Sequence, residues 1–304
     1  MNNSGIRLVK NKDVDYGKWD SCVARSVVPL VYAQSHYLDL ISPGWDALIL
    51  GDYDYVMPLN IKKKLGFKFL LQPIFAQQHG IFPDVTESVQ HIFLNYIKQH
   101  FRYVSIQVNS SHSVRIPDGF LLNKRTNFIL KLSSTYEELK NNYSKHARRQ
   151  IKKANDNKVF VIKGLQTKEY MDLKNLATEN KLPKPSMHTL QRLIEYGTSH
   201  GKGMIYAAYS QENILCSAAF FLNSGHRVIY LNAASSSEGK ANRSMYQIVD
   251  QFIREHSGSG LILDFEGSSI PGIARFYSGF GAQTEYYNSL KLNRLPIPLR
   301  WLIK

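Results

Sequence analysis

Hydrophobic residues recur along the chain with two spacings, every second residue or every third to fourth residue. Alternation predicts strands, and the longer period predicts helices. In the first half the pattern predicts strands at 6–9, 47–51, 55–62, 67–71, 103–108 and 128–132, with helices at 13–24, 35–41 and 86–100. In the second half it predicts helices at 136–142, 145–157, 168–179, 187–200, 242–255 and 272–277, with strands at 159–163, 204–210, 214–222, 228–233, 261–265 and 283–292.

Each half therefore consists of helices, a run of strands, a helix, a strand and a last strand, although the two halves share little sequence. Strands and helices in this order favour a mixed α/β (α+β) sheet in each half. A polar stretch at 133–135 precedes a predicted helix and indicates the boundary. We expect one domain over 1–135, a second over 136–292, and a tail over 293–304 that packs back on the body.

Two local features refine these elements. Ser144 precedes the helix at 145–157, and a serine hydroxyl there accepts one of the unpaired N–H groups of the first turn, so we expect Ser144 to be the N-cap. The run Lys62, Lys63 and Lys64 comes shortly before Gly66 between two predicted strands. We expect these lysines to form a solvated hairpin turn.

The composition is that of a globular protein with an excess of positive charge. Of 304 residues 43% are hydrophobic, which excludes a disordered chain and leaves room for two domains. Lys and Arg number 38 against 24 Asp and Glu, a formal +14, which indicates polyanionic partners. Cys22 and Cys216 cannot build a disulfide framework, so we expect a reduced, cytoplasmic protein. No apolar run has the length of a membrane-spanning helix or a signal peptide.

Chemistry is best sought where the strand at 261–265 ends. The chain has no phosphate-binding loop, dinucleotide, zinc-protease or serine-hydrolase motif, and no Cys or His at metal-binding spacing, so we expect no metal. Asp264 and Glu266 are two residues apart and so share one side of the strand end, where ligands of α/β sheets tend to bind. The alternative is a strand-to-helix turn in which Ser268 is a helix cap and the acids accept backbone N–H groups.

The same stretch carries a family pattern. Ala274, Phe276, Tyr277 and Gly281 have the spacing A-x-F-Y-x-x-x-G ahead of the last strand, and Asp264-Phe265, Gly267-Ser268 and Phe280 complete it. The chain thereby resembles the GNAT acyltransferase superfamily, and more closely its tandem-GNAT FemABX-type and BioF2-like acetyltransferase group. The resemblance is weaker in the first half, where Gln72-Pro73 and the Gln77-Gln78-His79-Gly80 run carry it. It implies two GNAT-like domains, each with a mixed, mostly antiparallel central sheet flanked by helices.

The resemblance also implies roles for individual residues. Tyr277 is the candidate general acid, and Glu266 or Asp264 the candidate base or acceptor-orienting group. Tyr230 and Asn232 lie two apart on a strand that borders the acceptor and thioester site in that fold, so with Ser268 they are candidate substrate-binding residues. The alternative for Tyr230 and Asn232 is packing within the sheet.

The donor-binding loop departs from the family. Acetyl-CoA enzymes of the superfamily carry an R/Q-x-x-G-x-G/A loop whose N–H groups hold pyrophosphate at a helix N-terminus. Here the corresponding stretch at 234–242 reads ASSSEGKAN, with a single glycine. The resemblance implies donor contacts from this region, namely Ser235, Ser236, Ser237, Gly239, Lys240, Asn242 and Arg243. Because FemABX-type proteins also lack the loop and use aminoacyl-tRNA, the donor stays open between acyl-CoA or acetyl-CoA and aminoacyl-tRNA.

A basic segment is the remaining signal. Between Lys140 and Lys158 there are seven positive residues and one acid, Asp156, and Ala147, Ile151 and Ala154 form an apolar stripe for docking the helix. We expect a polyanion-binding face for tRNA, CoA or a nucleotide-linked precursor, made by Lys145, Arg148, Arg149, Lys152 and Lys153. The alternative is a solvated helix face. Interleaved aromatic residues, typical of single-strand binders, are absent.

The leading hypothesis is an acyltransferase that moves an acyl or acetyl group from a CoA-type donor to the amine of a small-molecule or nucleotide-linked acceptor. The attacking amine must be neutral and the leaving group needs a proton, which calls for a base and an acid. One alternative is a FemABX-type transferase that uses aminoacyl-tRNA on a cell-wall precursor. The other is a catalytically inactive GNAT pair that binds nucleic acid or a partner.

Overall fold

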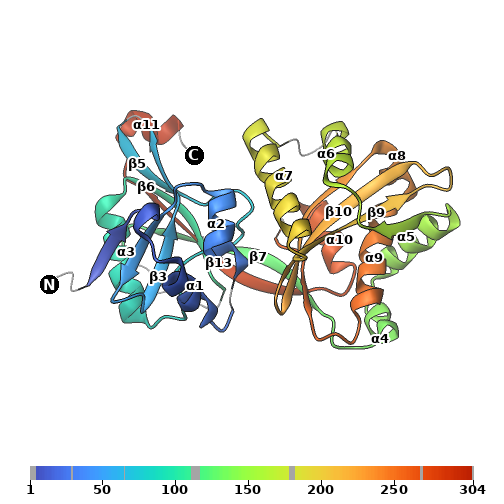
Figure 1. Ribbon diagram of the computed structural model, residues 1–304, viewed down its shortest axis with the longest axis horizontal. Coiled ribbons are helices and arrows are strands. Elements are labelled where there is room, and N and C mark those ends of the chain that lie inside the picture. The colour runs from blue at the N-terminus through green and yellow to red at the C-terminus, as the bar shows by residue number, and fades with distance from the viewer. Residues whose placement is uncertain are drawn as a thin grey trace. The chain divides into compact units, whose positions relative to one another are not determined.

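The chain divides into two compact units. The computed structural model describes residues 5–28, 30–64, 66–110, 117–177, 182–267 and 270–302. Unit 1 comprises Met1–Arg125 with Tyr286–Lys304, and unit 2 comprises Thr126–Glu285 (Figure 1). The divisions fall inside two long strands, β7 (Leu121–Lys131) and β13 (Gln283–Asn293). These limits differ from the expected ones at residues 135 and 292, because the polar stretch before residue 136 caps a helix within unit 2 rather than linking two domains.

Unit 1 contains two groups of strands. β1 (Ile6–Val9), β2 (Asp46–Leu50) and β3 (Tyr55–Leu59) form an antiparallel sheet. β4 (Ile61–Lys64) and β5 (Phe67–Leu71) form a hairpin, β5 runs parallel to β6 (Tyr103–Val108), and β6 pairs with β13. The helices are α1 (Tyr16–Ala24), α2 (Ser35–Ile41), α3 (Glu87–His100) and α11 (Ile297–Leu302), with 3-10 turns at Asn11–Asp13 and Val31–Ala33. The tail returns to this unit, where Leu295 packs with Phe69 and Tyr103.

Two predictions in unit 1 were wrong in detail. The strand expected at 55–62 divides at Asn60 into β3 and β4, which belong to different sheets. The lysines at 62–64 are exposed, as expected, but they lie in β4 and not in a turn, with Lys64 opposite Phe67. Gly66, at φ +77°, takes the turn conformation instead. Because β4 ends the strand order, its lysines protect an edge from further strand pairing.

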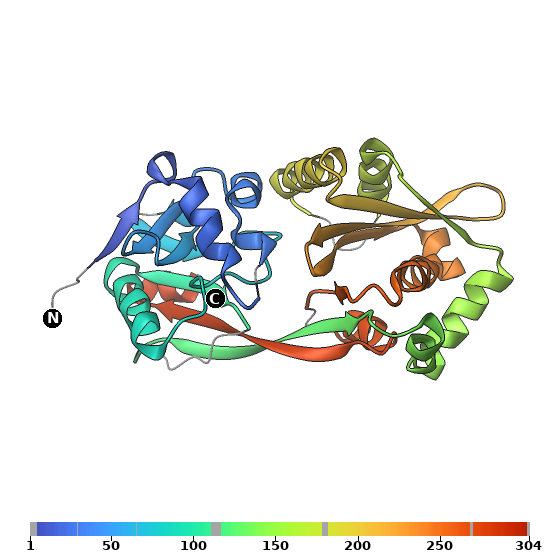
Figure 2. The same cartoon turned by 60° about the horizontal axis from the view of Figure 1, so that its bottom comes forward.

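Unit 2 has the mixed, mostly antiparallel sheet that the family resemblance implies. β8 (Phe160–Lys163), β9 (Gly203–Tyr209), β10 (Leu215–Ser224) and β11 (Arg227–Ser235) form an antiparallel meander. β12 (Ile262–Asp264) runs parallel to β11 and antiparallel to β7. The helices are α4 (Tyr136–Asn141), α5 (Lys145–Asp156), α6 (Thr167–Leu176), α7 (Lys184–Ser199), α8 (Ser237–Asn242), α9 (Ser244–His256) and α10 (Pro271–Ser278). Within unit 2, α6 and α7 cover one face of the strands and α9 the other (Figure 2).

The helix expected at 242–255 begins two residues later, at Ser244, and a short helix before it, α8, was not expected. Arg243 adopts a left-handed conformation, with φ 61°, and it separates α8 from α9. Four serines then join α8 to the sheet, because Ser217 Oγ bonds to both Ser235 Oγ (2.8 Å) and Ser244 Oγ (2.6 Å), and Ser236 Oγ donates to the Cys216 carbonyl. Serine destabilises the interior of a helix, and here the serine hydroxyls stabilise the bend between α8 and α9.

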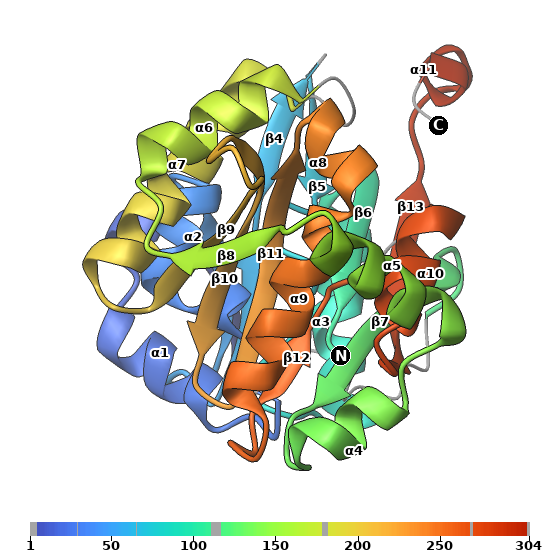
Figure 3. The ribbon, with the colours of Figure 1, turned by 90° about the vertical axis from the view of Figure 1, so that its right-hand side faces the viewer.

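Helix α5 has the two faces predicted from its sequence. Ser144 caps it, since the serine Oγ accepts from Ala147 N at 3.1 Å. Ala147, Ile151 and Ala154 are buried and the intervening cations are exposed. The helix packs against α9 and lies near α10 (Figure 3). Among the described residues of the chain, no helix is both long and apolar enough to cross a bilayer.

Candidate functional site

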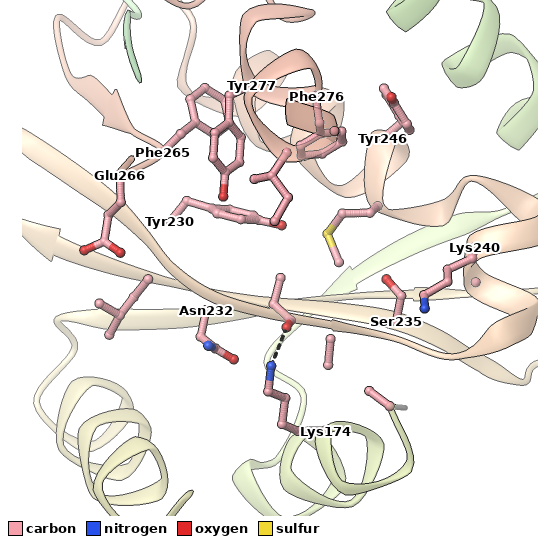
Figure 4. Close-up of a pocket in the computed structure, with 18 of the residues that line it drawn as sticks. Lys174, Tyr230, Asn232, Ser235, Lys240, Tyr246, Phe265, Glu266, Phe276 and Tyr277 are labelled. Atoms are coloured by element: carbon pink, nitrogen blue, oxygen red, sulfur yellow. Dashed lines mark hydrogen bonds between the residues drawn. The ribbon is translucent and has the colours of Figure 1, made fainter. Parts of the chain in front are cut away.

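A parallel strand pair in unit 2 separates after three residues. β12 pairs with β11 only from Arg227 to Ile229, whereas on its other side β11 stays paired with β10 as far as Ser235. β12 therefore leaves the edge of β11 uncovered from Tyr230 onward. A cavity of about 470 Å³ lies along this edge, with walls from α6, β11, the α8–α9 bend, the end of β12 and α10 (Figure 4).

Tyr277 forms the α10 wall of the cavity. Its ring stacks on Phe265, with 4.9 Å between centroids, and meets Tyr230 edge-on at 6.0 Å. Figure 4 shows its hydroxyl pointing into the cavity toward Tyr230. Burial raises the pKa of Tyr277, and the negative charges of Glu266 and Asp264 raise it further. The hydroxyl therefore stays protonated at neutral pH and is a proton donor.

The two carboxylates at the end of β12 have different surroundings. Glu266 has φ 59° and lines the cavity, because the chain turns immediately after the strand. Asp264 is buried, and its Oδ1 accepts from Glu266 N at 2.9 Å while its Oδ2 accepts from Arg227 Nη1 at 2.6 Å. The expectation that both acids share one face of a regular strand fails at this left-handed turn. Asp264 is not among the residues that line the described cavity.

Arg227 connects Asp264 to the last strand. Its Nη2 donates to Glu285 Oε1 at 2.9 Å, and Asn127 Nδ2 donates to Glu285 Oε2 at 3.1 Å. Burial lowers the pKa of Arg227, but the carboxylates of Asp264 and Glu285 outweigh burial and raise it above its usual value. Burial raises the pKa of Asp264, and Arg227 opposes that shift. This ion cluster holds the end of β12 in place.

Helix α6 contributes Lys174 to the opposite wall, and Tyr170, one turn earlier on this helix, supports that wall without lining the cavity. Tyr170 is buried and donates its hydroxyl to Asn232 Oδ1 at 2.8 Å. Lys174 donates from Nζ to the Ala233 carbonyl at 3.1 Å, a contact drawn in Figure 4. Both acceptors lie on β11 beyond the point where β12 separates. The wall therefore presents an ammonium and a side-chain amide to the cavity.

The serine-rich turn at the start of α8 bonds to itself. Ser236 Oγ accepts from Gly239 N at 3.0 Å, so that N–H is already paired. A Cβ on Gly239 would lie 2.2 Å from the Cys216 carbonyl oxygen, which means that the glycine is needed for close packing of α8 on β10. The single glycine left in this loop is therefore explained by packing, and its N–H already has a partner within the turn.

The basic helix α5 contacts the wall of the same cavity through one aromatic pair. His146 of α5 meets Tyr246 at 6.2 Å between centroids, and Tyr246 meets Phe276 edge-on at 4.7 Å. Tyr246 and Phe276 both line the cavity. The positive charges of Arg243 and Arg275 act on Tyr246, where they oppose the effect of burial on its pKa. At this end of the cavity Lys240 and Arg243 line the wall, and Arg275 lies close enough to Tyr246 to affect its pKa.

The structure brings together about half of the residues singled out from the sequence. The following line the cavity: Tyr230, Asn232, Ser235, Gly239, Lys240, Arg243, Glu266 and Tyr277. Ser236 is the helix cap, Ser237 is exposed, and Asn242 lies at the end of α8. Ser268 lies outside the described residues. The five cations of α5 are exposed on the helix beside the cavity and do not line it.

Sequence analysis did not identify many residues of the walls, and four of these have aromatic or charged side chains. Phe265, Phe276 and Tyr246 were overlooked as wall residues, and Lys174 was not singled out at all. Nothing in the spacing of the sequence distinguishes Lys174, because its place in the wall depends on the packing of α6 against β11. The described residues hold no group of three or more His, Cys, Asp or Glu side chains arranged for a metal ion.

Comparison with known proteins identifies the fold. The chain matches no family model and no curated protein sequence. Its structure is similar to that of FemX (14% identity, TM-score 0.65, 95% of this chain and 98% of that one). It is also similar to L-PGS from Bacillus licheniformis, with 10% identity, a TM-score of 0.57 and coverage of 95% of each chain. A third similar structure is a tandem GNAT protein from the clavulanic acid biosynthesis pathway, with 11% identity, a TM-score of 0.57 and coverage of 96% of this chain and 99% of that one. The resemblance to the tandem-GNAT and FemABX-type group is thus confirmed for the fold.

Proposed function

We propose that the protein is an acyltransferase that moves an acyl or aminoacyl group from a polyanionic carrier to an amine in the cavity of unit 2. The observation that carries the proposal is the separation of β12 from β11 beside a cavity that contains both a carboxylate, Glu266, and a protonated hydroxyl, Tyr277. The similarity of the fold to GNAT and FemX structures supports acyl transfer as the type of reaction.

The two side chains suit the two proton transfers of the reaction. The amine attacks the acyl carbonyl carbon and forms the new C–N bond, while Glu266 accepts the amine proton directly or through a water. The bond from the carbonyl carbon to the carrier's sulfur or oxygen then breaks, and Tyr277 donates its proton to that leaving atom. A raised pKa keeps Tyr277 protonated before the step, as a general acid requires. We assign Asp264 a structural role, since Arg227 occupies its carboxylate.

We propose that the carrier is tRNA charged with an amino acid. The N–H of Gly239 is used within the turn, which removes one donor that a CoA pyrophosphate would need. The exposed cations of α5, together with Lys240 and Arg243 at the cavity, offer a surface suited to a longer phosphate backbone. Acyl-CoA is the second candidate, supported by the similar fold of the tandem GNAT protein and by a cavity whose lining includes β11 from Tyr230 to Ser235.

A transfer assay with two labelled donors tests the proposal. The protein is incubated with either a mixture of radiolabelled aminoacyl-tRNAs or radiolabelled acetyl-CoA, each with a set of amine acceptors, and the label in the acceptor fraction is counted. The proposal predicts transfer from aminoacyl-tRNA. Transfer only from acetyl-CoA overturns the assignment of the carrier and retains acyl transfer. No transfer from either donor, with tRNA still bound, favours a binding module.

The charged face has its own test with a matched control. Replacing Arg148, Arg149, Lys152 and Lys153 with glutamine should weaken tRNA binding and flatten its dependence on salt, because each phosphate contact adds roughly 0.7 to 0.9 to the slope of log K against log salt. The control replaces four exposed lysines of unit 1, Lys62, Lys63, Lys64 and Lys68, and removes the same charge. If the two variants lose equal affinity and slope, net charge and not the α5 face is responsible.

A further inference from the structure

The α6 wall holds an amide in one fixed orientation. Burial raises the pKa of Tyr170, so its hydroxyl stays protonated and donates to Asn232 Oδ1 at 2.8 Å. An asparagine amide has one acceptor end and one donor end. Since Tyr170 occupies the oxygen, the nitrogen end of Asn232, with its two N–H groups, is the end available to a ligand in the cavity that Asn232 lines.

Lys174 stands beside this amide with spare hydrogen-bond donors. A lysine ammonium has three N–H donors, and Lys174 uses one of them on the Ala233 carbonyl, the residue next to Asn232. Among the described residues the ammonium has no carboxylate partner, and burial alone lowers its pKa. Removing a charge from water without an opposite charge is unfavourable. An anion in the cavity would supply the missing partner.

We propose that Lys174 and Asn232 form a carboxylate-binding subsite for the acceptor, so that the acceptor is an α-amino acid. The ammonium and the amide N–H groups provide donors for the two carboxylate oxygens. Glu266 lies in the same cavity and suits the amine end of such a molecule. The phosphates of the carrier would meet other cations, Lys240 and Arg243, at the α8–α9 bend. The binding of a carboxylate at this subsite is argued from the site alone. Only the statement that the bound molecule is the acceptor rests on the proposed function.

Binding of matched pairs of compounds tests the subsite on the wild-type protein. The twenty common L-amino acids and their carboxamides are compared by thermal shift, and those that stabilise the protein are titrated by calorimetry. We expect at least one amino acid to raise the melting temperature and its carboxamide to have no effect. If no amino acid stabilises the protein, or if an acid and its amide bind equally, the subsite does not exist.

Variants then assign the binding to Lys174. Lys174→Met should raise the Kd of that amino acid by roughly 10- to 100-fold, as expected for the loss of one hydrogen bond to a charged group, whereas Lys174→Arg should retain part of the affinity. The control is Lys168→Met, which removes an exposed lysine from the same helix and should leave the Kd unchanged. Equal Kd values for wild type and Lys174→Met would overturn the assignment.

Transfer measurements separate this inference from the proposed function. If acids and amides are acylated equally well and Lys174→Met keeps its rate, the protein is an acyltransferase without the subsite. If an amino acid binds in a Lys174-dependent manner but accepts label from neither donor, the subsite stands and the proposed function fails. A Lys174-dependent preference for succinyl-CoA over acetyl-CoA, without preference among acceptors, would place the carboxylate on the acyl group and overturn the acceptor assignment.

Discussion

The two units contain the same kind of parallel strand pair, but only the pair in unit 2 opens onto the described cavity. In unit 1, β5 and β6 pair from Phe69 to Leu71, and the chain then stays against β6. Gln72 N donates to the Ser105 carbonyl at 2.8 Å, and Gln72 Oε1 accepts from Gln107 N at 3.0 Å. In unit 2, β12 ends after three paired residues and leaves the edge of β11 to cavity-lining side chains. The path of the chain beyond each strand pair therefore decides whether the strand edge is covered or open to a ligand.

The length of the connection that follows β5 or β11 explains why one strand edge is covered and the other is open. Residues 72–86 connect β5 to α3, whereas Ser236 alone connects β11 to α8. The long connection returns alongside β6, where His79 N donates to the Gln107 carbonyl at 2.9 Å. At Gly80 a Cβ would lie 3.2 Å from Asn109 N, so the close approach needs a glycine. The Gln77-Gln78-His79-Gly80 run that resembled the family therefore closes a gap in unit 1.

The largest expected effect is on turnover at the open strand pair. Tyr277→Phe removes one hydroxyl and keeps the ring stacked on Phe265, so turnover should fall roughly 10²- to 10⁴-fold, the usual contribution of acid–base assistance, while stability changes little. Glu266→Gln should slow the reaction similarly. The control is Tyr209→Phe, on β9 of the same unit and away from the cavity lining. If both variants keep full activity with the donor that supports transfer, the acid–base roles are wrong.

The next effect concerns the ion cluster that holds the open end of β12. Arg227→Met leaves the buried carboxylate of Asp264 without a counter-ion and should lower the free energy of unfolding by about 3 to 5 kcal/mol, measured by urea denaturation. Adding Asp264→Asn to this variant removes the unpaired charge and should restore part of that loss. A loss below about 1 kcal/mol for Arg227→Met would show that water screens the cluster.

Acid should weaken the closed unit through His79. This imidazole is buried, its Nε2 contacts the Tyr32 carbonyl at 2.9 Å, and burial lowers its pKa to about 4. In the unfolded chain the pKa is about 6.5, so the unfolded state binds more protons between these values and stability falls as pH decreases. From pH 7 to pH 5 the loss should be about 2 kcal/mol. His79→Gln, compared by urea denaturation at both pH values, should remove that part of the loss; an unchanged loss would contradict the assignment.

The smallest effect is expected from opening the closed pair. Gln72→Ala deprives Gln107 N and the Ala76 carbonyl of their partner, which should cost about 1 kcal/mol of stability. Transfer activity should stay at the wild-type level, because unit 1 supplies no residue to the described cavity of unit 2. Loss of transfer in a folded Gln72→Ala protein would mean that unit 1 takes part in the reaction.

Much of the fold was predictable from local pattern. Strands such as Ile6–Val9 and Tyr103–Val108, and the helix Ser35–Ile41, have the predicted limits, because alternation and helical periodicity report which side of each element is buried. The predictions were wrong where one residue's backbone conformation decides the outcome. Arg243 at φ 61° ends α8 and moves the start of the helix expected at 242–255 to Ser244. Gly66 takes the turn that the lysine run was expected to form.

The site was less accessible from sequence, because its chemistry depends on contacts between distant segments. Asp264 and Glu266 have similar side chains two residues apart, and only the position of Arg227 and the left-handed turn at Glu266 separate their surroundings. Lys174 faces the cavity because α6 packs on β11, a contact that spacing alone does not reveal. The family pattern identified Tyr277 and the end of β12, whereas the α6 wall with Lys174 became visible only in the structure.

A crystal structure of the protein with a donor analogue tests the central claim most directly. The two analogues are CoA and a stable amide-linked 3′-aminoacyl-adenosine, each at saturating concentration. We predict density for the analogue along the edge of β11 between Tyr230 and Ser235, with the thiol of CoA or the amide carbonyl of the aminoacyl-adenosine beside Tyr277. Density for either analogue in unit 1, beside Gln72 and His79, or outside the cavity of unit 2 would contradict it.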